Sequence, residues 1–298
     1  MKKAYFLIGV LALSFAQLLA QTNYVITRPD NVTLYVNEYG AGKPVILLGG
    51  GPGLNPGYLV PICQNMTGYR FIIPHQRGSG QSKMDKVDSL NMSTDKYVED
   101  LEALRIQLKL SKLIIAGHSW GGMLGFAYAA KYPDKVDRLI LLGPGGITST
   151  FFTYFDSNIQ MRLHEEDNEE AKKSTAREGG LKAIIPGYFF NRERALIMKN
   201  MLDSTLMNRN QSAIYKFTIK SYTATQADRV KDIRKYKNPV YIIQGRQDPI
   251  GESTVYETKE ALPQTKFTFI EECGHFPWLE EEKAVAEFYQ LLNSALKN

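Results

Sequence analysis

The sequence is poor in the residues that bind metals or crosslink small domains. Its 298 residues include only two cysteines, Cys63 and Cys273, and four histidines. These residues are scattered, and no pair stands at a metal-binding spacing, so we expect no metal site and no cofactor. A chain of this length needs no disulfide to stabilise its core. The sequence leaves open whether the two thiols are free, which we favour, or form a bridge.

The net positive charge is too small to indicate nucleic-acid binding. The formal net charge is +5, of which Lys2 and Lys3 supply two units, and no run of Lys and Arg is interleaved with aromatic residues. Long apolar runs are also missing after the first twenty residues, so we expect no membrane span in the rest of the chain. With 44% hydrophobic and 22% charged residues, the composition is that of a globular protein.

Residues 1–20 resemble a secretory signal peptide. Lys2 and Lys3 precede an uncharged apolar body, and the small Ala20 stands before a polar run. This pattern predicts cleavage near Ala20 and export, to the periplasm or the medium. A membrane-anchored form is the alternative, because the apolar run approaches the length of a span. The sequence does not predict the oligomeric state.

Beyond residue 20, short apolar segments alternate with helical ones. A β-rich entry covers 23–27 and 32–39, and further strands are expected at 45–48, 70–74, 113–116, 138–142, 240–244 and 266–270. Helical patterns lie between them, at 94–108, 120–131 and 253–262, and a last helix is expected over 281–296. Strands that alternate with helices predict an α/β fold, with a mostly parallel, doubly wound sheet covered on both faces.

Residues 147–237 interrupt this alternation, because they contain no clear buried strand. The segment opens with several aromatic residues and continues through charged, helix-forming stretches. A structureless loop of this length is improbable inside a compact domain. We therefore expect a helical cap over 147–237, inserted into a core formed by 21–146 and 238–298.

The segment Gly117-His118-Ser119-Trp120-Gly121 fits the pattern Gly-x-Ser-x-Gly, with an apolar strand before it and a helix after it. In this context a sharp strand-to-helix turn exposes the serine, and the flanking glycines prevent collisions between chain segments. Ser119 is therefore a candidate nucleophile. The rival interpretation is a small polar residue at a helix start.

A serine nucleophile needs a histidine base and an acid that orients it. His275 follows the last predicted strand, whereas His164 lies in the charged insertion, His75 is in a loop near the site, and His118 is expected to turn away from its neighbour. Asp248 stands just after the preceding strand, with Glu252 as the alternative acid. The order Ser119, Asp248, His275 is the order expected of a catalytic triad in this strand–helix architecture.

An oxyanion hole needs two N–H donors. Trp120, directly after the nucleophile, is expected to supply one of them. The other is expected from the glycine-rich segment after strand 45–48, with Gly51 as the first choice and Gly50 as the second. A phosphate-binding loop is disfavoured, because no Gly-Lys-Ser/Thr follows these glycines.

Three segments resemble the motifs of the proline iminopeptidase-like group of the α/β-hydrolase fold. They are Gly49-Gly50-Gly51-Pro52-Gly53, His75-Gln76-Arg77-Gly78-Ser79-Gly80-Gln81-Ser82 and Gly117-His118-Ser119-Trp120-Gly121-Gly122, each with one departure from the family pattern. The resemblance covers nearly the whole chain after residue 20. It implies the α/β-hydrolase fold with a helical cap and the triad Ser119, Asp248 and His275.

The resemblance further implies an exported aminopeptidase of proline iminopeptidase type, which acts on short peptides. In that group, cap carboxylates in a Trp-Glu motif bind the substrate's amino group. The cap here contains no Trp, and none of its acids stands in that motif: Glu165, Glu166, Glu169, Glu170, Glu178, Glu193 and Asp203. The alternative is therefore a carboxylesterase or lactone hydrolase acting on small acyl substrates.

A third interpretation is a binding protein that keeps the fold, which the intact triad and glycine loop disfavour. Dehalogenase and epoxide hydrolase chemistry would need Asp in place of Ser119.

Overall fold

The computed structural model of the chain describes residues 21–173, 182–201 and 210–297. The predicted signal peptide, residues 1–20, lies outside this range. In the part of the chain that is described, no helix combines the length and apolar character needed to cross a membrane.

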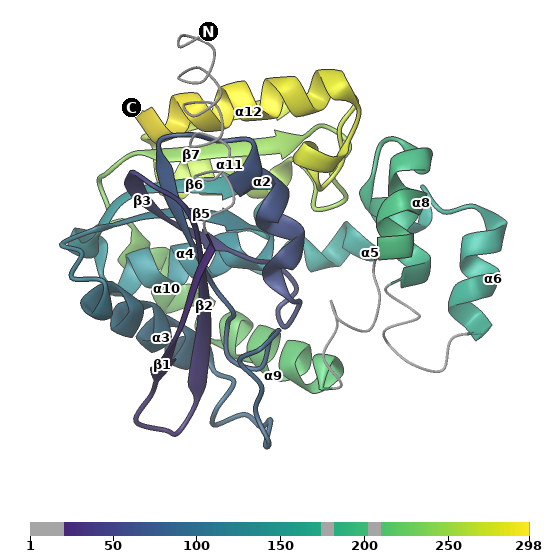
Figure 1. The fold of residues 1–298 in the computed structure, drawn as a ribbon. Helices are drawn as coiled ribbons and strands as arrows, with labels where there is room; N and C mark the ends of the chain where they lie inside the picture. The colour runs from purple at the N-terminus through teal and green to yellow at the C-terminus, as the bar shows by residue number, and fades with distance from the viewer. Residues whose placement is uncertain (1–20, 174–181, 202–209, 298) are drawn as a thin grey trace, which may run out of the picture.

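An eight-stranded sheet forms the centre of the molecule (Figure 1). The strands pair in the order β1-β2-β4-β3-β5-β6-β7-β8. The strand β2 runs antiparallel to both of its neighbours, and from β4 to β8 all neighbours are parallel. The strands are β1 (Gln21–Thr27), β2 (Thr33–Gly40), β3 (Lys43–Leu48), β4 (Tyr69–Pro74), β5 (Leu113–His118), β6 (Val136–Leu142), β7 (Val240–Gly245) and β8 (Thr265–Ile270).

Side chains from the two faces of the sheet enter two separate hydrophobic cores. In β3, Ile46 and Leu48 enter one core, and Val45 and Leu47 enter the other. This alternation follows from the two-residue period of a strand, and strands buried on both faces become continuous apolar runs. The sequence pattern of short, uninterrupted apolar segments has this origin.

Helices cover both faces of the sheet, with α12 on one side and α3, α4 and α10 on the other (Figure 1). The stripe of Ala284, Phe288 and Leu292 on α12 recurs every four residues and packs into one core. The first face carries α3 (Thr94–Gln107), α4 (Trp120–Lys131), α10 (Gln226–Ile233) and α11 (Ser253–Ala261), and the second carries α2 (Val60–Gln64) and α12 (Glu282–Lys297). Short 3₁₀ turns are η1 (Pro56–Leu59), η2 (Pro133–Lys135) and η4 (Pro277–Leu279).

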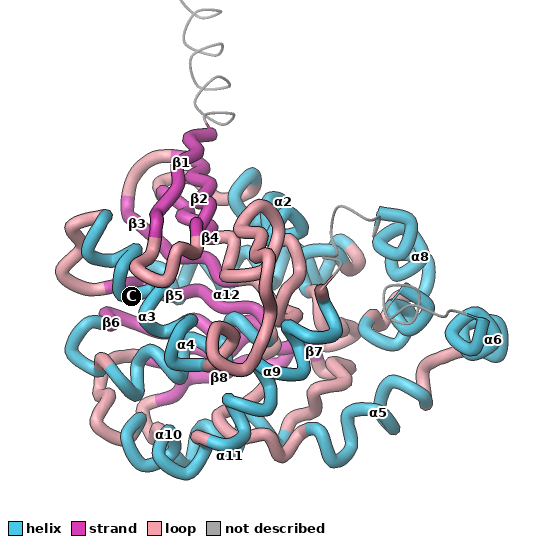
Figure 2. Tube along the Cα trace, turned by 90° about the horizontal axis from the view of Figure 1, so that it is seen from below, coloured by secondary structure: helices cyan, strands magenta, loops and turns pink. Residues whose placement is uncertain are grey.

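The described residues between β6 and β7 are helical. They form α5 (Phe152–Gln160), α6 (Glu165–Lys173), η3 (Ile185–Tyr188), α8 (Arg192–Met201), α9 (Gln211–Ala224) and α10. Figures 1 and 2 show α5, α6 and α8 projecting beyond one side of the sheet. The helix α10 lies within the predicted insertion, but it packs against α4 in the core layer.

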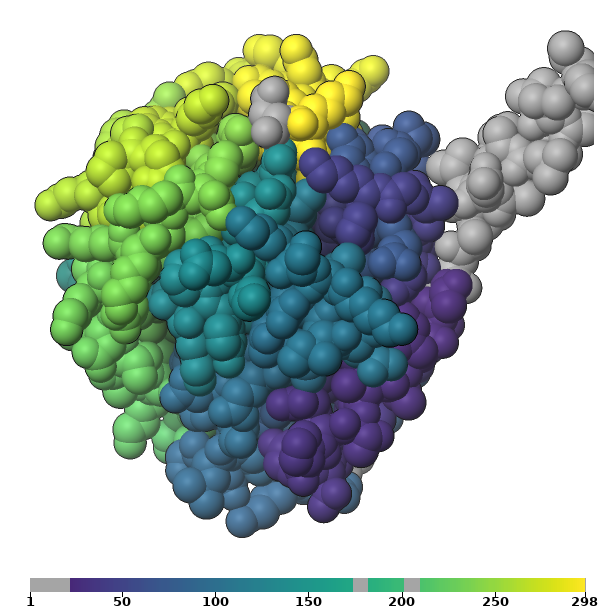
Figure 3. All heavy atoms as spheres, turned by 90° about the vertical axis from the view of Figure 1, so that its left-hand side faces the viewer, coloured from purple at the N-terminus to yellow at the C-terminus, as the bar shows by residue number. Residues whose placement is uncertain are grey.

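The observed architecture confirms the predicted α/β fold, its mostly parallel sheet and the β-rich entry, which forms β1 and β2. Figure 3, viewed from the side away from α6 and α8, shows the N-terminal strands and α12 on one surface. A hydrogen bond of 3.2 Å from Lys43 Nζ to the Leu296 carbonyl joins the start of β3 to the end of α12. The carboxyl ends of β3, β5, β7 and β8 lead to the glycine loop, Ser119, Asp248 and His275.

Candidate active site

Ser119 occupies a strained turn between β5 and α4. Its φ of 55° and ψ of −119° lie outside the conformations that a residue with a side chain ordinarily adopts. The neighbouring glycines make this turn possible. A Cβ atom at Gly117 would lie 2.4 Å from the Gly121 carbonyl oxygen, and one at Gly121 would lie 2.3 Å from that of Leu48. The turn exposes Ser119 at the amino end of α4, and its side chain lines a cavity.

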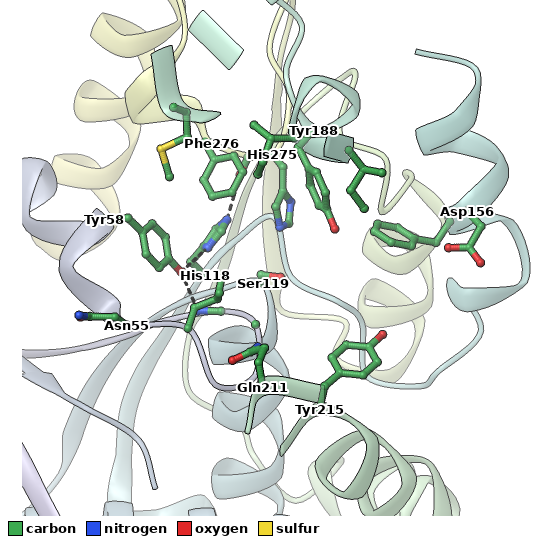
Figure 4. Close-up of a pocket in the computed structure, with 17 residues that line it drawn as sticks. Asn55, Tyr58, His118, Ser119, Asp156, Tyr188, Gln211, Tyr215, His275 and Phe276 are labelled. Carbon is green, nitrogen blue, oxygen red and sulfur yellow. Dashed lines mark hydrogen bonds between the residues drawn. The ribbon is translucent and has the colours of Figure 1, made fainter. Parts of the chain in front are cut away.

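His275 and Asp248 form a buried hydrogen-bonded pair at the ends of neighbouring strands. Nδ1 of His275 lies 2.8 Å from Oδ2 of Asp248, and the other carboxylate oxygen accepts a hydrogen bond of 2.9 Å from the Ile250 N–H. The ionised carboxylate can only accept, so Nδ1 of His275 carries the proton and Nε2 keeps its lone pair. His275 lines the same cavity as Ser119, and Figure 4 shows the two side chains near one another.

Glu252, the alternative acid of the sequence analysis, is not in this pair. Its carboxylate binds Arg246 at 2.8 Å on the surface. Asp248, by contrast, is 3% exposed and reaches the imidazole directly.

The glycine loop after β3 borders the cavity through Gly50 and Gly51. The N–H of Gly50 donates a 2.6 Å hydrogen bond to the hydroxyl of Tyr58, which removes Gly50, our second choice, as an oxyanion donor in this conformation. Gly51 and Trp120 remain as candidates. Trp120 is the first residue of α4, where helix N–H groups have no acceptor within the helix. Its side chain is held by a 2.7 Å bond from the indole Nε1 to Gln76.

His118 lines the same cavity as Ser119, which the sequence analysis did not predict. It is 2% exposed and lines the cavity, and its ring centroid lies 4.5 Å from that of His275. Its Nδ1 lies 2.9 Å from the Tyr58 hydroxyl, and its Nε2 lies 3.0 Å from the His275 carbonyl oxygen. Burial lowers the pKa of His118 well below its usual value.

The other two histidines lie away from the cavity. His75 is buried, and both of its ring nitrogens have hydrogen-bond partners. Its Nε2 lies 2.5 Å from Oδ1 of Asn37, and its Nδ1 accepts the N–H of Gln81. His164 is exposed and lies 3.8 Å from Glu166 on the cap.

The cavity measures about 330 Å³ and is lined mainly by apolar and aromatic side chains. Core and cap both contribute to its wall (Figure 4). The cap residues in the lining are Phe155, Asp156, Ile184, Ile185, Tyr188, Met198, Gln211 and Tyr215. Such a wall suits an apolar group attached to the reacting carbonyl.

The cap acids named in the sequence analysis do not line the cavity, as far as they are described. Glu165, Glu166, Glu169 and Glu170 border a separate open groove along α6, and Glu193 is exposed on α8. Glu178 and Asp203 fall outside the described residues. Asp156 of α5, an exposed residue, is the acidic cap residue in the cavity lining, and the sequence analysis missed it because no motif surrounds it.

Two sets of hydrogen bonds tie the cap to the loops of the site. The Tyr188 carbonyl accepts the His275 N–H at 2.7 Å, and Nε2 of Gln211 donates to the Pro52 carbonyl at 2.6 Å. The buried carboxylate of Glu280 accepts the N–H groups of Gly274 and Phe190, both at 2.8 Å. The position of the cap is therefore linked to the loop that carries His275.

Within the described residues, no three His, Cys, Asp or Glu side chains form a group suited to a metal ion. Cys63 and Cys273 are both free and buried, in agreement with the favoured interpretation.

Comparison with known proteins places this geometry in a family. The profile of the alpha/beta hydrolase fold matches residues 43–282. Lipase 1 of Psychrobacter immobilis is 27% identical over 281 residues, which cover 90% of this chain and 82% of the lipase. A proline iminopeptidase of Lactobacillus helveticus is 24% identical over 258 residues, which cover 83% of this chain and 88% of the peptidase. An esterase structure from Exiguobacterium antarcticum has a TM-score of 0.69 at 21% identity, over 93% of this chain and 100% of the esterase.

Proposed function

The chain belongs to the α/β-hydrolase fold family and is a hydrolase, and we propose that it is a serine hydrolase that cleaves carboxylic esters. The observation that supports this most directly is the His275–Asp248 pair, 2.8 Å apart, next to the strained Ser119 in one largely apolar cavity. The mechanism is acyl transfer to water through an acyl-enzyme.

In the first step, Nε2 of His275 takes the proton of the Ser119 hydroxyl, and the serine oxygen attacks the carbonyl carbon of the ester. The negative charge that develops on the carbonyl oxygen is stabilised by the N–H groups of Gly51 and Trp120. The C–O bond to the alcohol then breaks, and the alcohol leaves with the proton from His275. Asp248 stabilises the imidazolium and holds the ring in place.

In the second step, water replaces the alcohol. Nε2 of His275 takes a proton from the water, whose oxygen attacks the acyl carbon on Ser119. The bond between the carbon and the serine oxygen breaks, and the proton returns to Ser119. The products are a carboxylic acid and the free enzyme, so no cofactor is needed.

The cavity wall favours an ester with an apolar acyl or alcohol group. Phe155, Ile185 and Phe276 are among its apolar members, and the acids on α6 face a separate groove. A substrate with a free ammonium group would need a carboxylate partner, because an unpaired buried charge is costly.

A second candidate is an aminopeptidase, which Asp156 favours. Among the described residues, Asp156 is the acidic cap residue in the cavity lining, and it lies on the exposed side of α5. It could pair with the amino group of a short peptide. A proline iminopeptidase is among the relatives of the chain.

Covalent labelling tests the shared mechanism. A fluorophosphonate probe is expected to label the wild-type protein and not the Ser119→Ala variant, because the probe reacts with an activated serine. Absence of labelling on correctly folded wild-type protein would contradict the serine hydrolase.

A comparison of substrates separates the two candidates. We expect turnover of p-nitrophenyl butyrate, lost in Ser119→Ala and unchanged in Asp156→Asn, with little turnover of proline p-nitroanilide. Glu165→Gln, which removes a cap carboxylate outside the cavity, is the matched control. If proline p-nitroanilide is the better substrate and Asp156→Asn raises its KM while Glu165→Gln does not, the aminopeptidase replaces the esterase.

A further inference from the structure

Two side chains in the cavity wall, Tyr58 and His118, take no part in the chemistry described above. Both are nearly buried, at 8% and 2% exposure. The Tyr58 hydroxyl lies 2.6 Å from the Gly50 nitrogen and 2.9 Å from Nδ1 of His118, and Nε2 of His118 lies 3.0 Å from the carbonyl oxygen of His275. Figure 4 shows this chain of contacts as dashed lines.

The direction of every hydrogen bond in the chain follows from its two ends. The His275 carbonyl can only accept, so Nε2 of His118 carries the proton and donates. Nδ1 of His118 therefore has the lone pair and accepts from the Tyr58 hydroxyl. The hydroxyl oxygen in turn accepts the N–H of Gly50. Each of the polar atoms has a partner, and one tautomer of His118 satisfies them all.

This chain of hydrogen bonds joins the three backbone segments that must be aligned for catalysis. Gly50 precedes the candidate oxyanion donor Gly51, His118 precedes Ser119, and the final acceptor is the backbone of His275 itself. We propose that Tyr58 and His118 are positioning residues that hold the oxyanion loop and the His275 loop at a fixed distance from Ser119. The proposal rests on the serine hydrolase function proposed above.

Aromatic side chains pack around the hydrogen bonds that join Gly50, Tyr58, His118 and His275. The indole Nε1 of Trp278 donates to the Tyr58 carbonyl at 3.2 Å, and its ring stacks on that of Tyr58 with centroids 6.2 Å apart. Phe276 contacts the ring of His118, with centroids 5.1 Å apart. Aromatic side chains with few accessible rotamers are well suited to hold a hydrogen-bond network in one arrangement.

A second function of His118, as a base for Ser119, is excluded by the same contacts. Both ring nitrogens are occupied, one by Tyr58 and one by His275. Burial and the neighbouring His275 also lower the pKa of His118. A neutral ring at this place is useful, because a charged one would oppose formation of the His275 imidazolium during the reaction.

The Tyr58→Phe variant tests the proposal, because it keeps the ring and removes the hydroxyl. We expect kcat for p-nitrophenyl butyrate to fall by about 10- to 100-fold, with KM little changed, since the loss concerns the alignment of the reacting groups. The affinity for a trifluoromethyl ketone, which imitates the tetrahedral intermediate, is expected to fall in parallel. Tyr236→Phe is the matched control: it removes a buried hydroxyl that bonds the Pro239 carbonyl, away from the cavity. Equal effects of the two variants on kcat would overturn the proposal.

Two variants of His118 test the two ends of the chain separately. His118→Asn places an acceptor where Nδ1 stands and keeps the bond to Tyr58, whereas His118→Gln places a donor where Nε2 stands and keeps the bond to His275. The part of the Tyr58 effect that passes through His118 is lost in His118→Gln, so Tyr58→Phe is expected to lower kcat more in the His118→Asn background than in the His118→Gln background. Fully additive effects in the His118→Gln background would contradict the linkage.

A measurement that needs no turnover distinguishes failure of this proposal from failure of the proposed function. Nitrogen-15 NMR of the wild-type protein, with the signals assigned by His118→Gln, is expected to show His118 protonated at Nε2 and not at Nδ1. Protonation at Nδ1 would overturn the proposal, whatever the activity. Absence of Ser119-dependent hydrolysis and labelling, with Nε2 protonated, would leave the hydrogen-bonded chain in place and refute the serine hydrolase together with the catalytic role of the chain.

Discussion

Single residues in this site are held in conformations that the chain would not adopt without support. Ser119 has a φ of 55°, a region that costs a residue with a side chain on the order of 1 to 3 kcal/mol. His275 is fixed from two sides, by the Asp248 carboxylate and by the Tyr188 carbonyl. The strain at Ser119 and the fixed imidazole are both typical of a nucleophile and its base, which is the role that we propose for them.

The orientation of His275 by Asp248 leads to a prediction for Asp248→Asn. The amide can donate to Nδ1 of His275, which favours the tautomer protonated at Nε2, and that tautomer cannot accept the serine proton. We expect kcat for p-nitrophenyl butyrate to fall by about 10⁴-fold. Circular dichroism should show an unchanged fold.

Glu252→Gln is the control for this prediction, since Glu252 lies on the surface beside Arg246. If it reduces kcat as much as Asp248→Asn does, the acid has been assigned to the wrong residue.

Two elements meet closely beneath the nucleophile. The amino end of α4 approaches the carboxyl end of β3, and at Gly121 a Cβ atom would lie 2.3 Å from the Leu48 carbonyl oxygen. Four residues further along α4, Gly125 faces the sheet. A Cβ atom there would lie 3.5 Å from side-chain atoms of Ile115 and Leu139, which is an ordinary van der Waals distance. Proximity to β3 therefore constrains the first turn of α4 more than the rest of the helix.

Substitution by alanine is predicted to destabilise the protein at Gly121 but not at Gly125. Gly121→Ala would place Cβ 2.3 Å from the Leu48 carbonyl oxygen, and we expect it to lower the free energy of unfolding by about 3 kcal/mol or more. Gly125→Ala should leave stability unchanged or raise it by up to about 1 kcal/mol, because alanine favours the helix.

Urea titration monitored by circular dichroism measures both variants. If Gly125→Ala lowered the free energy of unfolding as much as Gly121→Ala, the proposed role of the contact with β3 would be contradicted.

Hydrogen bonds also connect elements of the cap with loops of the core. Glu280 accepts N–H groups from the His275 loop and from the residues that precede α8, and Gln211 at the start of α9 reaches the Pro52 carbonyl. A movement of the cap would therefore act on both loops that border the nucleophile.

Across the whole molecule, a core on each face of the sheet surrounds several buried polar groups. His75 and His118 are the titratable members with the clearest consequence for stability. Burial lowers the pKa of His75 to about 4 and that of His118 well below its usual value. Both rings therefore remain neutral in the folded protein at pH values where the unfolded chain binds protons.

We expect stability to fall as the pH decreases below the pKa of histidine in the unfolded chain, about 6.5. The unfolded state then binds protons that the folded state cannot bind, until the pH reaches the lowered pKa values. For each histidine that stays neutral in the folded protein, the free energy of unfolding falls by about 1.4 kcal/mol for every pH unit below about 6.5 in this window. Urea titrations at pH 7, 6 and 5 measure the slope.

His75→Gln keeps a donor to Asn37 and is expected to make the slope shallower, whereas His164→Gln removes an exposed ring and should not change it. An unchanged slope in His75→Gln would show that His75 is not the group responsible.

Much of the fold and of the candidate site follows from local sequence patterns. The strands and helices were predicted because uninterrupted apolar segments and four-residue periodicities reflect burial on both faces of a parallel sheet. Ser119, Asp248 and His275 were predicted as a set because each follows a strand, and parallel strands bring their carboxyl ends to one edge. The glycines of the turn are recognisable because no other residue fits there.

Contacts between side chains that are distant in the sequence become visible only in the folded chain. Tyr58 and His118 are 60 residues apart, and no local pattern indicates that their hydrogen bond exists or that it engages the Gly50 N–H. Asp156 lines the cavity, whereas the more numerous acids of α6 border a separate groove. The path of the cap helices, and not the number of charges on each helix, determines which residues line the cavity. The fold and the candidate nucleophile follow from the amino-acid sequence alone, since both depend on backbone geometry and local periodicity. The lining of the cavity depends on contacts between distant segments, which only the folded chain brings together.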